Sequence, residues 1–118
     1  MIPPSKLEVK DSPISGRGVF ATEDIIEGEV VEECHFLPIT LADYKALENL
    51  QSIVHNFPTN KKNCVVVLGY GSIYNHSSGS PNAYWETDEE NNLFRFIALT
   101  DISAGQEALV DYKKPDAP

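Results

Sequence analysis

The first residues that could do chemistry lie in the segment SGRGVFA at residues 15–21, where two glycines flank Arg17 in front of an apolar run. Glycine has no side chain, so Gly16 and Gly18 would let backbone carbonyl and amide groups approach a ligand closely. Arg17 between them could reach that ligand. Taken alone, the segment is more often a tight turn with a solvated arginine, because the third glycine and the following helix of a dinucleotide-binding motif are missing.

Two further segments place hydrogen-bonding side chains among turn residues. In GYGSIYNHSSGSPN, residues 69–82, Asn75 and His76 offer an amide, an imidazole and backbone groups, enough to bind an adenine edge or an amino-acid moiety. In GQEALVDY, residues 105–112, a strand-like run ends on Tyr112, whose hydroxyl could point into a pocket. Considered separately, His76 would be a structural histidine and Tyr112 a core aromatic, although Asn-His-Ser followed by Pro-Asn is uncommon by chance.

The elements that must position these segments are mostly short strands. Proline and glycine interrupt short apolar runs, which is typical of a β-rich domain. Several runs are too apolar to alternate cleanly, so we expect both sheet faces to be partly covered. The predicted strands are residues 7–10, 18–21, 30–36, 65–68, 83–87, 93–99 and 108–111.

The segments between the strands predict one helix and several turns. Thr40 can cap a helix, and apolar residues follow it at helical spacing, namely Leu41, Tyr44, Leu47 and Leu50. Residues 56–63 are predicted to form an exposed loop, and residues 86–92 a hairpin tip whose four acidic residues are solvated. An Asp-Ile pair leads through a glycine turn into a strand at residues 24–28 and again at 101–105, which suggests a fold built from similar hairpins.

The composition limits the class of protein. A chain of 118 residues, 42% hydrophobic and 23% charged, predicts one globular domain over residues 1–118 and not a disordered chain. A net charge of −9 argues against direct nucleic-acid binding and allows a lysine-rich partner. Cys34 and Cys64 lack the spacing of a zinc site or a disulfide scaffold, so no metal is expected. With neither a membrane span nor a signal core, we expect a soluble, intracellular protein, cytoplasmic or nuclear.

Taken in order, the three segments resemble the SET domain, the fold of protein-lysine methyltransferases. That family commonly carries Gly-x-Gly-Val-Phe-Ala near its start, Asn-His-Ser-x-x-Pro-Asn in its middle and Gly-Glu-Glu-Leu-x-x-x-Tyr near its end. These motifs correspond here to residues 16–21, 75–82 and 105–112, and the resemblance spans about residues 7–112. The chain looks most like the minimal stand-alone SET proteins of large DNA viruses and bacteria. The resemblance implies a mainly β fold, the β-clip, with short strands in small sheets, one short helix and a knot-like C-terminal crossing.

The resemblance also implies an activity and the residues that perform it. The family transfers a methyl group from S-adenosylmethionine to a lysine that enters a narrow channel, so a lysine-containing protein such as a histone tail is the expected substrate. The expected cofactor-binding residues are Gly16, Arg17, Gly18, Phe20, Asn75, His76 and Tyr112. Tyr112 would also be the catalytic residue, at the junction of the two pockets. The expected channel walls are Tyr70, Tyr74, Tyr84 and Trp85, with Tyr70 and Trp85 nearest the lysine and at least two of the four used in core packing.

The sequence departs from the family pattern in a few places. Three residues, 78–80, separate Asn-His-Ser from Pro-Asn where two are usual, and Gln106 and Ala108 replace a glutamate and a leucine. No cysteine cluster follows Tyr112, and residues 113–118 contain no aromatic. A second copy in a homodimer, the substrate itself or the loop at residues 56–63 would therefore have to close the lysine channel.

Two other functions stay open on the sequence alone. A SET-like interaction module would keep the fold and lack methyl transfer. A cysteine hydrolase could pair Cys34 or Cys64 with His76, although neither cysteine lies at a helix start or in a nucleophile elbow.

Overall fold

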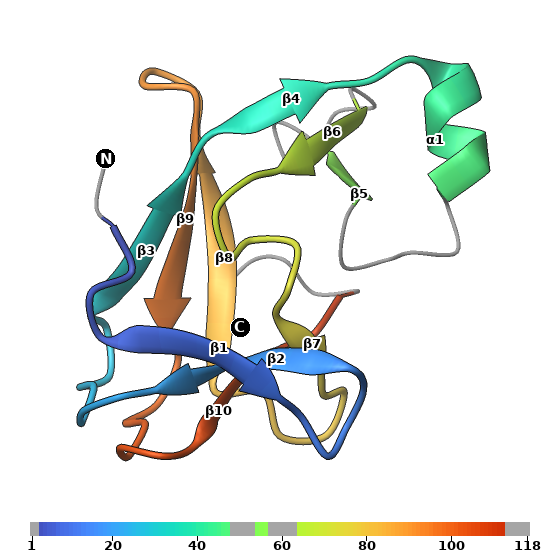
Figure 1. The fold of residues 1–118 in the computed structure, drawn as a ribbon. Helices are drawn as coiled ribbons and strands as arrows, with labels where there is room; N and C mark the ends of the chain where they lie inside the picture. Colours follow the sequence, from blue (N-terminus) through green and yellow to red (C-terminus); the bar gives the residue numbers. More distant parts are fainter. Residues whose placement is uncertain (1–2, 48–53, 57–63, 113–118) are drawn as a thin grey trace.

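The first of three small sheets holds the first, second and third sequence motifs together. The structure, a computed structural model, describes residues 3–47, 54–56 and 64–112 (Figure 1). The strand order of this sheet is β1-β2-β10-β7, with β1 at Leu7–Asp11, β2 at Arg17–Ala21, β10 at Glu107–Val110 and β7 at Asn75–His76. β1 and β2 form an antiparallel hairpin, while β10 lies antiparallel to β2 and parallel to β7.

The second sheet has the order β3-β9-β8 and is antiparallel throughout. Its strands are β3 at Val30–Cys34, β9 at Leu93–Ala98 and β8 at Ala83–Asp88. In Figure 1 these strands run across the first sheet at a steep angle. β8 and β9 form a hairpin whose tip includes Asn92 at φ 54°, a conformation that asparagine adopts more readily than most residues.

The third sheet and the single helix lie at one side of the molecule (Figure 1). The sheet has the order β4-β6-β5, with β4 at Phe36–Pro38, β6 at Cys64–Val67 and β5 at Val54–Asn56. The helix α1 covers Leu41–Leu47. Thr40 caps it, because its Oγ1 accepts the Asp43 amide hydrogen at 3.1 Å.

The prediction of a mainly β fold with one short helix is confirmed. The predicted strand at residues 30–36 is two strands, because the partner changes at His35: Cys34 pairs with Phe94 of β9, whereas Phe36 pairs with Val67 of β6. The sequence analysis did not predict β5 or β7, which are only three and two residues long. Leu50 and residues 57–63 of the predicted loop lie outside the described residues. Among the described helices, none is long and apolar enough to cross a membrane.

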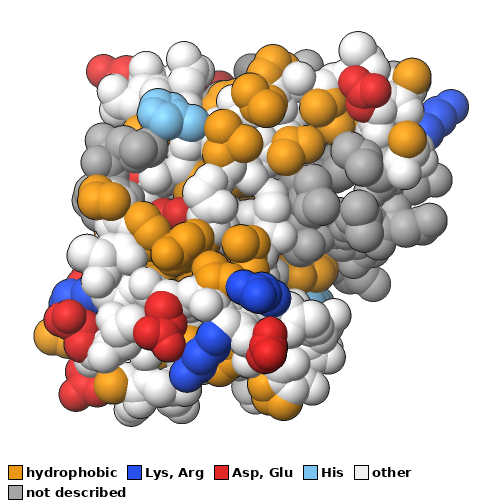
Figure 2. Space-filling view, in the orientation of Figure 1, with side chains coloured by type: hydrophobic (Ala, Val, Ile, Leu, Met, Phe, Trp, Pro, Cys, Tyr) orange, Lys and Arg blue, Asp and Glu red, His pale blue; other side chains and the backbone are white. Residues whose placement is uncertain are grey.

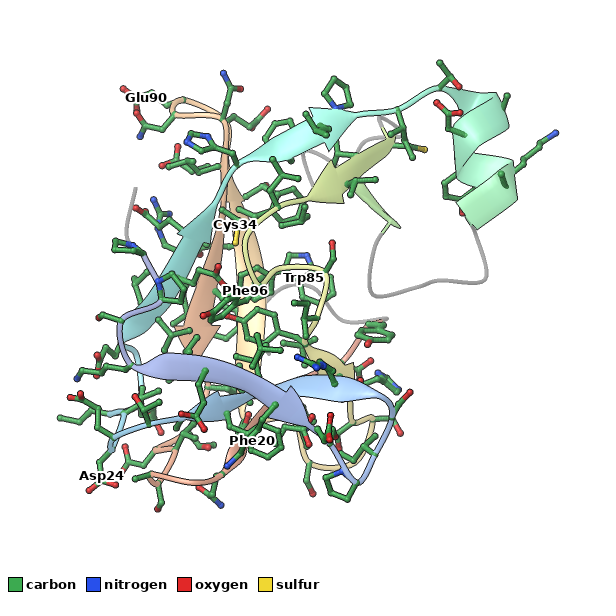
Figure 3. The ribbon with its side chains drawn as sticks, in the orientation of Figure 1. Phe20, Asp24, Cys34, Trp85, Glu90 and Phe96 are labelled. Atoms are coloured by element: carbon green, nitrogen blue, oxygen red, sulfur yellow. The ribbon has the colours of Figure 1, made fainter. Side chains whose placement is uncertain are left out.

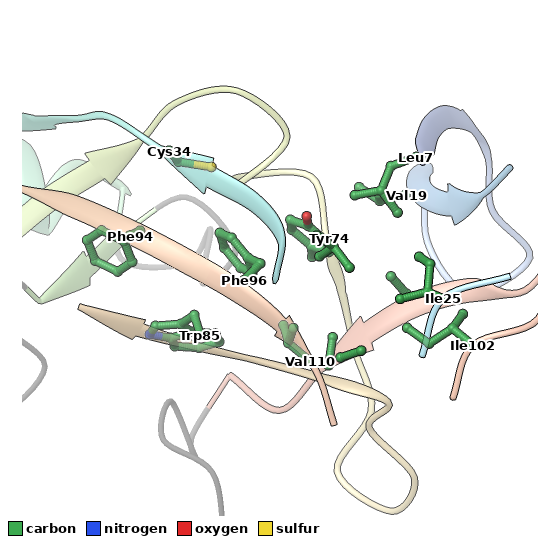
Figure 4. Packing of buried hydrophobic residues seen from close by; sticks show 14 of the residues in the cluster. Leu7, Val19, Ile25, Cys34, Tyr74, Trp85, Phe94, Phe96, Ile102 and Val110 are labelled. Atoms are coloured by element: carbon green, nitrogen blue, oxygen red, sulfur yellow. The ribbon is translucent and has the colours of Figure 1, made fainter. Parts of the chain in front are cut away.

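Side chains from all three sheets pack into one core, part of which is shown in Figure 4. Its centre is aromatic: the Tyr74 ring stacks on the Phe96 ring with centroids 4.3 Å apart, and Trp85 lies 6.3 Å from Phe96. β2 contributes Val19 and Ala21, which alternate with residues on its other face. Through Tyr74, the second sequence motif therefore packs directly against β9 of the second sheet.

The two Asp-Ile turns pair with each other instead of forming separate hairpins. Ile25 and Ile102, both 1% exposed, exchange two backbone hydrogen bonds of 2.8 and 2.9 Å. Asp101 Oδ1 accepts the Glu27 amide at 2.8 Å, and Asp24 makes the equivalent bond in the other turn at 2.9 Å. The repeated sequence thus joins the segment before β3 to the segment before β10.

Only some of the acidic residues of the β8–β9 hairpin lie at its tip. Arg95 of β9 donates hydrogen bonds to Glu86 at 3.2 Å, to Asp88 at 2.8 Å and to Glu33 of β3 at 2.9 Å. Hydrogen bonds from Asn91 and Arg95 lower the pKa of Asp88 to about 2. The prediction of four solvated acids is therefore wrong for Glu86 and Asp88, which lie on β8 within reach of Arg95.

Replacement of Asp101 tests the reciprocal turn contact. Asp101→Ala removes the acceptor of the Glu27 amide, so we expect the free energy of unfolding to fall by about 1 kcal/mol, the net value of one such hydrogen bond. Asp101→Asn keeps an oxygen at Oδ1 and should remain close to wild type. Urea denaturation of the three proteins measures the difference, and equal losses in both variants would contradict the assignment.

Candidate active site

Asn75 joins the second motif to the first. Its side chain is 8% exposed, and its Nδ2 donates hydrogen bonds to the backbone carbonyls of Ser15 and Arg17, both at 3.1 Å. The same Nδ2 also lies 2.8 Å from Glu107 Oε2. The Gly16–Gly18 turn is therefore fixed by an amide that comes from a strand about 60 residues further along the chain.

Glu107 explains why a glycine stands at position 18. The Ser12 hydroxyl donates to Glu107 Oε1 at 2.7 Å, while Oε2 accepts from Asn75. A Cβ atom built on Gly18 would collide with the Glu107 carboxylate. This close approach needs a residue without a side chain, so Gly18 and Glu107 depend on each other.

The loop after β7 is tied to β10 along its length. The Ser77 amide donates to the Val110 carbonyl at 3.0 Å. At the other end, the Asn82 side chain donates to the Glu107 carbonyl and accepts the Leu109 amide, both at 2.8 Å. Asn82 thus satisfies two backbone groups of β10 and holds the crossing of the second and third motifs.

Tyr112 lies where the second and third motifs meet. Its hydroxyl donates to the Tyr74 backbone carbonyl at 2.7 Å, and its backbone amide donates to His76 Nδ1 at 3.0 Å. The His76 and Tyr112 rings are tilted, with centroids 4.9 Å apart. Asp111 Oδ1 lies 3.9 Å from His76 Nδ1. Both ends of the tyrosine are therefore held by residues 74–76.

The remaining expected cofactor residues lie on or beside β2. Gly16 has φ 48°, a left-handed conformation that favours glycine. The Arg17 side chain is 71% exposed, with its Nε 3.9 Å from Asp11. Phe20 lies on the face of the hairpin away from Trp85 and the core (Figure 3), and the Lys10 ammonium lies 4.6 Å from the centre of its ring. The structure brings Gly16, Arg17 and Gly18 beside Asn75, while Phe20 has Lys10 as a neighbour.

The four expected channel residues divide into two kinds. Tyr74 and Trp85 are 1% and 4% exposed and belong to the core, as expected for two of the four. Tyr70 and Tyr84 are half-buried, and Tyr70 packs against the core from its edge. Trp85, which the sequence analysis places nearest the lysine together with Tyr70, is buried with its ring centroid 6.3 Å from that of Phe96.

Three residues of this region were not singled out as site residues from the sequence. Glu107 and Asn82 lay inside the motifs, but nothing in their spacing showed that they bond to Asn75 and to β10. Glu32 is a buried acid in the run VVEEC. Two adjacent glutamates in an apolar strand were a signal, because neighbouring residues of a regular strand face opposite sides.

The geometry argues against a cysteine hydrolase. Cys34 is 2% exposed, and burial with Glu32 nearby raises the pKa of its thiol, which disfavours the nucleophilic thiolate. Cys64 begins β6 in the third sheet, whereas His76 belongs to the first. His76 Nδ1 already accepts the Tyr112 amide, so its described contacts serve the tyrosine.

Comparison with known proteins gives one consistent relationship. The SET domain family model matches residues 16–113. A histone-lysine N-methyltransferase of Schizosaccharomyces pombe, specific for lysine 37 of histone H3, is 31% identical over 111 residues, which cover 92% of this chain and 74% of that protein. An N-lysine methyltransferase of Xenopus tropicalis is 34% identical over 82% of this chain, a match that covers 33% of that longer protein.

A solved structure shows the same fold. A crystal structure described as a candidate histone methyltransferase of Plasmodium falciparum superposes with a TM-score of 0.76 and 29% sequence identity, over 95% of both chains. The matched region contains all three motifs and the residues that join them. The chain therefore belongs to the SET-domain family of S-adenosylmethionine-dependent protein-lysine methyltransferases.

Proposed function

We propose that this chain methylates lysine side chains of a histone or another lysine-rich protein, with Tyr112 as the catalytic residue. The observation that carries the proposal is the Tyr112 hydroxyl, which is held on the Tyr74 carbonyl at 2.7 Å, one residue from the Asn75 amide. The names of the related histone methyltransferases and the net charge of −9 support a basic protein tail as substrate. Such a substrate supports an intracellular location, nuclear or cytoplasmic.

The residues around Asn75 fit S-adenosylmethionine. Asn75 is buried, yet its Oδ1 accepts no hydrogen bond from any residue that the structure describes. A buried acceptor without a donor is costly, so this oxygen suits the ammonium group of the methionine moiety. The exposed Arg17 side chain suits the carboxylate of the same moiety. The backbone of Gly16 and Gly18, with His76 next to Asn75 on β7 and Phe20 further along β2, completes the proposed binding surface.

The lysine must lose its proton before it can accept a methyl group. When bound, S-adenosylmethionine supplies an electrophilic methyl group on a positively charged sulfur. A free lysine has a pKa of ~10.4 and is almost fully protonated at neutral pH. An apolar channel favours the neutral amine, because burial disfavours the charged form. Tyr70 and Tyr84 line that channel in our proposal, with Tyr74 and Trp85 supporting it from the core.

Tyr112 acts as a protonated phenol in this scheme. Its hydroxyl hydrogen is directed to the Tyr74 carbonyl, which keeps the phenol protonated and orients its oxygen. In our proposal that oxygen accepts weak C–H···O contacts from the electron-poor methyl group. The hydrogen bond from the Tyr112 amide to His76 Nδ1 fixes the other end of the residue. Orientation of this kind can lower a barrier without a covalent intermediate.

We further propose that a second copy of the chain helps to close the lysine channel. Hydrophobic side chains gather over β4 and β6 in Figure 2, where Leu37 is 55% exposed. A two-fold pair could bury this surface, and two-fold pairs are the commonest oligomers. Light scattering should then give twice the chain mass. A monomeric mass together with full activity would remove the proposal.

The Tyr112→Phe variant tests the catalytic assignment. Loss of the hydroxyl removes the hydrogen bond to Tyr74, so the rate of methyl transfer should fall about 100-fold or more, as when one transition-state contact is removed. The matched control is Tyr44→Phe, a hydroxyl deletion on α1 in the third-sheet region. The measurement is transfer of isotopically labelled methyl to core histones and to a cell extract, with the modified residue located by mass spectrometry.

The same experiment separates the proposed activity from a silent SET-fold module. Label on lysine that is lost in Tyr112→Phe supports the enzyme and names its substrate. Cofactor binding without label on any protein would contradict the proposed substrate class. Absence of both label and cofactor binding would favour the silent module and overturn the assignment of Asn75.

Gly18→Ala tests the cofactor site without touching a polar side chain. The new Cβ displaces the Glu107 carboxylate and with it the partner of the Asn75 amide. We expect the dissociation constant for S-adenosylmethionine to rise about tenfold or more, which corresponds to about 1.4 kcal/mol. Gly79→Ala is the control, because a Cβ there meets open space. Calorimetric titration with the cofactor measures both, and an unchanged affinity in Gly18→Ala would show that this turn does not bind it.

A further inference from the structure

Glu32 is a buried acid that the chemistry described above does not use. Its side chain is 1% exposed. Among the described residues, no lysine, arginine or histidine affects the pKa of its carboxyl group. A β-bulge places it there: Val30 pairs with Ile97 and Glu32 with the adjacent Phe96, so β3 has one extra residue. Val31 and Glu32 both face inward as a result, and bulges commonly re-aim a side chain in this way.

The Glu32 carboxylate anchors the segment that leads into the second motif. Its Oε1 accepts the Tyr74 hydroxyl hydrogen at 2.7 Å, and its Oε2 accepts the Tyr70 amide at 2.8 Å. Gly69, at φ 66°, lies against the carboxylate so closely that a Cβ would come within 2.6 Å of Oε2. Burial raises the pKa of Glu32, and the hydrogen bonds from Tyr70 and Tyr74 oppose that shift. Both oxygens are therefore occupied by residues 70–74.

Tyr74 connects this anchor to the catalytic tyrosine. Its hydroxyl bonds to Glu32, and its backbone carbonyl accepts the Tyr112 hydroxyl at 2.7 Å. The stacked Phe96 ring holds the phenol between these two ends, and Figure 4 shows the Tyr74 hydroxyl directed toward β3. A shift of residue 74 would therefore move the acceptor that orients Tyr112.

We propose that Glu32 is a positioning residue for methyl transfer, whose buried carboxylate holds residues 70–74 so that the Tyr74 carbonyl fixes the Tyr112 hydroxyl. The inference rests on the proposed role of Tyr112. A core with only a packing requirement would be served by an apolar residue at position 32, because a buried charge is costly. The bulge, the two short hydrogen bonds and the glycine at position 69 all accommodate the acid instead.

Glu32→Gln tests the proposal with a side chain of the same shape. One oxygen becomes an N–H donor, so the amide can accept from Tyr74 or from Tyr70 but not from both. We expect kcat to fall about 10- to 100-fold, the range for a small misplacement of a reacting group. The dissociation constant for S-adenosylmethionine should stay within about twofold, because the contacts of Asn75, Gly18 and Glu107 are untouched.

Two other variants separate positioning from simple stability. Tyr74→Phe removes the same link from its other end and keeps the backbone carbonyl, so it should lower kcat in the same way even if Glu32→Gln folds poorly. Ile102→Val removes a buried methylene group from the contact with Ile25 and leaves the Glu32 carboxylate and its hydrogen bonds in place, so it should lower the melting temperature and not kcat. A loss of kcat in all three variants in proportion to their stability would overturn the proposal.

A spectroscopic measurement keeps the test independent of the substrate. In protein labelled with ¹³C at tyrosine Cζ, the Tyr112 resonance is the one missing from Tyr112→Phe. It should shift in Glu32→Gln and in Tyr74→Phe and stay in place in Ile102→Val; an unmoved resonance in both of the first two overturns the positioning role. If Tyr112→Phe keeps full transfer to core histones, the proposed function fails instead, whatever the resonance does.

Discussion

The position of β10 between β2 and β7 is the constraint on which the rest of the site depends. It brings together three motifs that lie about 60 and 30 residues apart in the chain. Glu107 at the start of β10 reaches the glycine turn through Asn75, and Tyr112 just after its end reaches the second motif through Tyr74 and His76. One short strand thus aligns the proposed cofactor-binding residues with Tyr112.

Asn75 and His76 show how a strand of two residues can direct two side chains to different partners. Neighbouring side chains of a strand point in opposite directions. The Asn75 amide is directed to the turn before β2, and the His76 imidazole to the Tyr112 amide. The parallel pairing of β7 with β10 fixes both directions at once. Substitution of either residue therefore disturbs its own hydrogen bonds directly and those of its neighbour through the strand.

The sequence predicted the residue types of the site better than their surroundings. Gly16, Gly18, Asn75 and Tyr112 stand in motifs, and the structure brings them together. The burial of Tyr74 and the half-exposure of Tyr84 could not be predicted, because both follow from which face of a strand each residue occupies. The pair of glutamates indicates that one of them faces inward, but the local sequence does not tell which, because the bulge that turns Glu32 inward depends on the pairing of β3 with β9. Likewise β7 is too short to show alternation, and only β10 defines it.

Because Cys34 is buried, the alkylation of its thiol can be used to measure local opening of the protein. At 2% exposure and with a raised pKa, this thiol cannot react with an alkylating reagent while β3 and β9 stay together. Its labelling rate is then the fraction of molecules transiently open multiplied by the rate for an unprotected thiol, by the same reasoning that applies to hydrogen exchange. Because Cys34 lies two residues from Glu32, that rate measures the fraction of time for which β3 is open beside the Glu32 carboxylate.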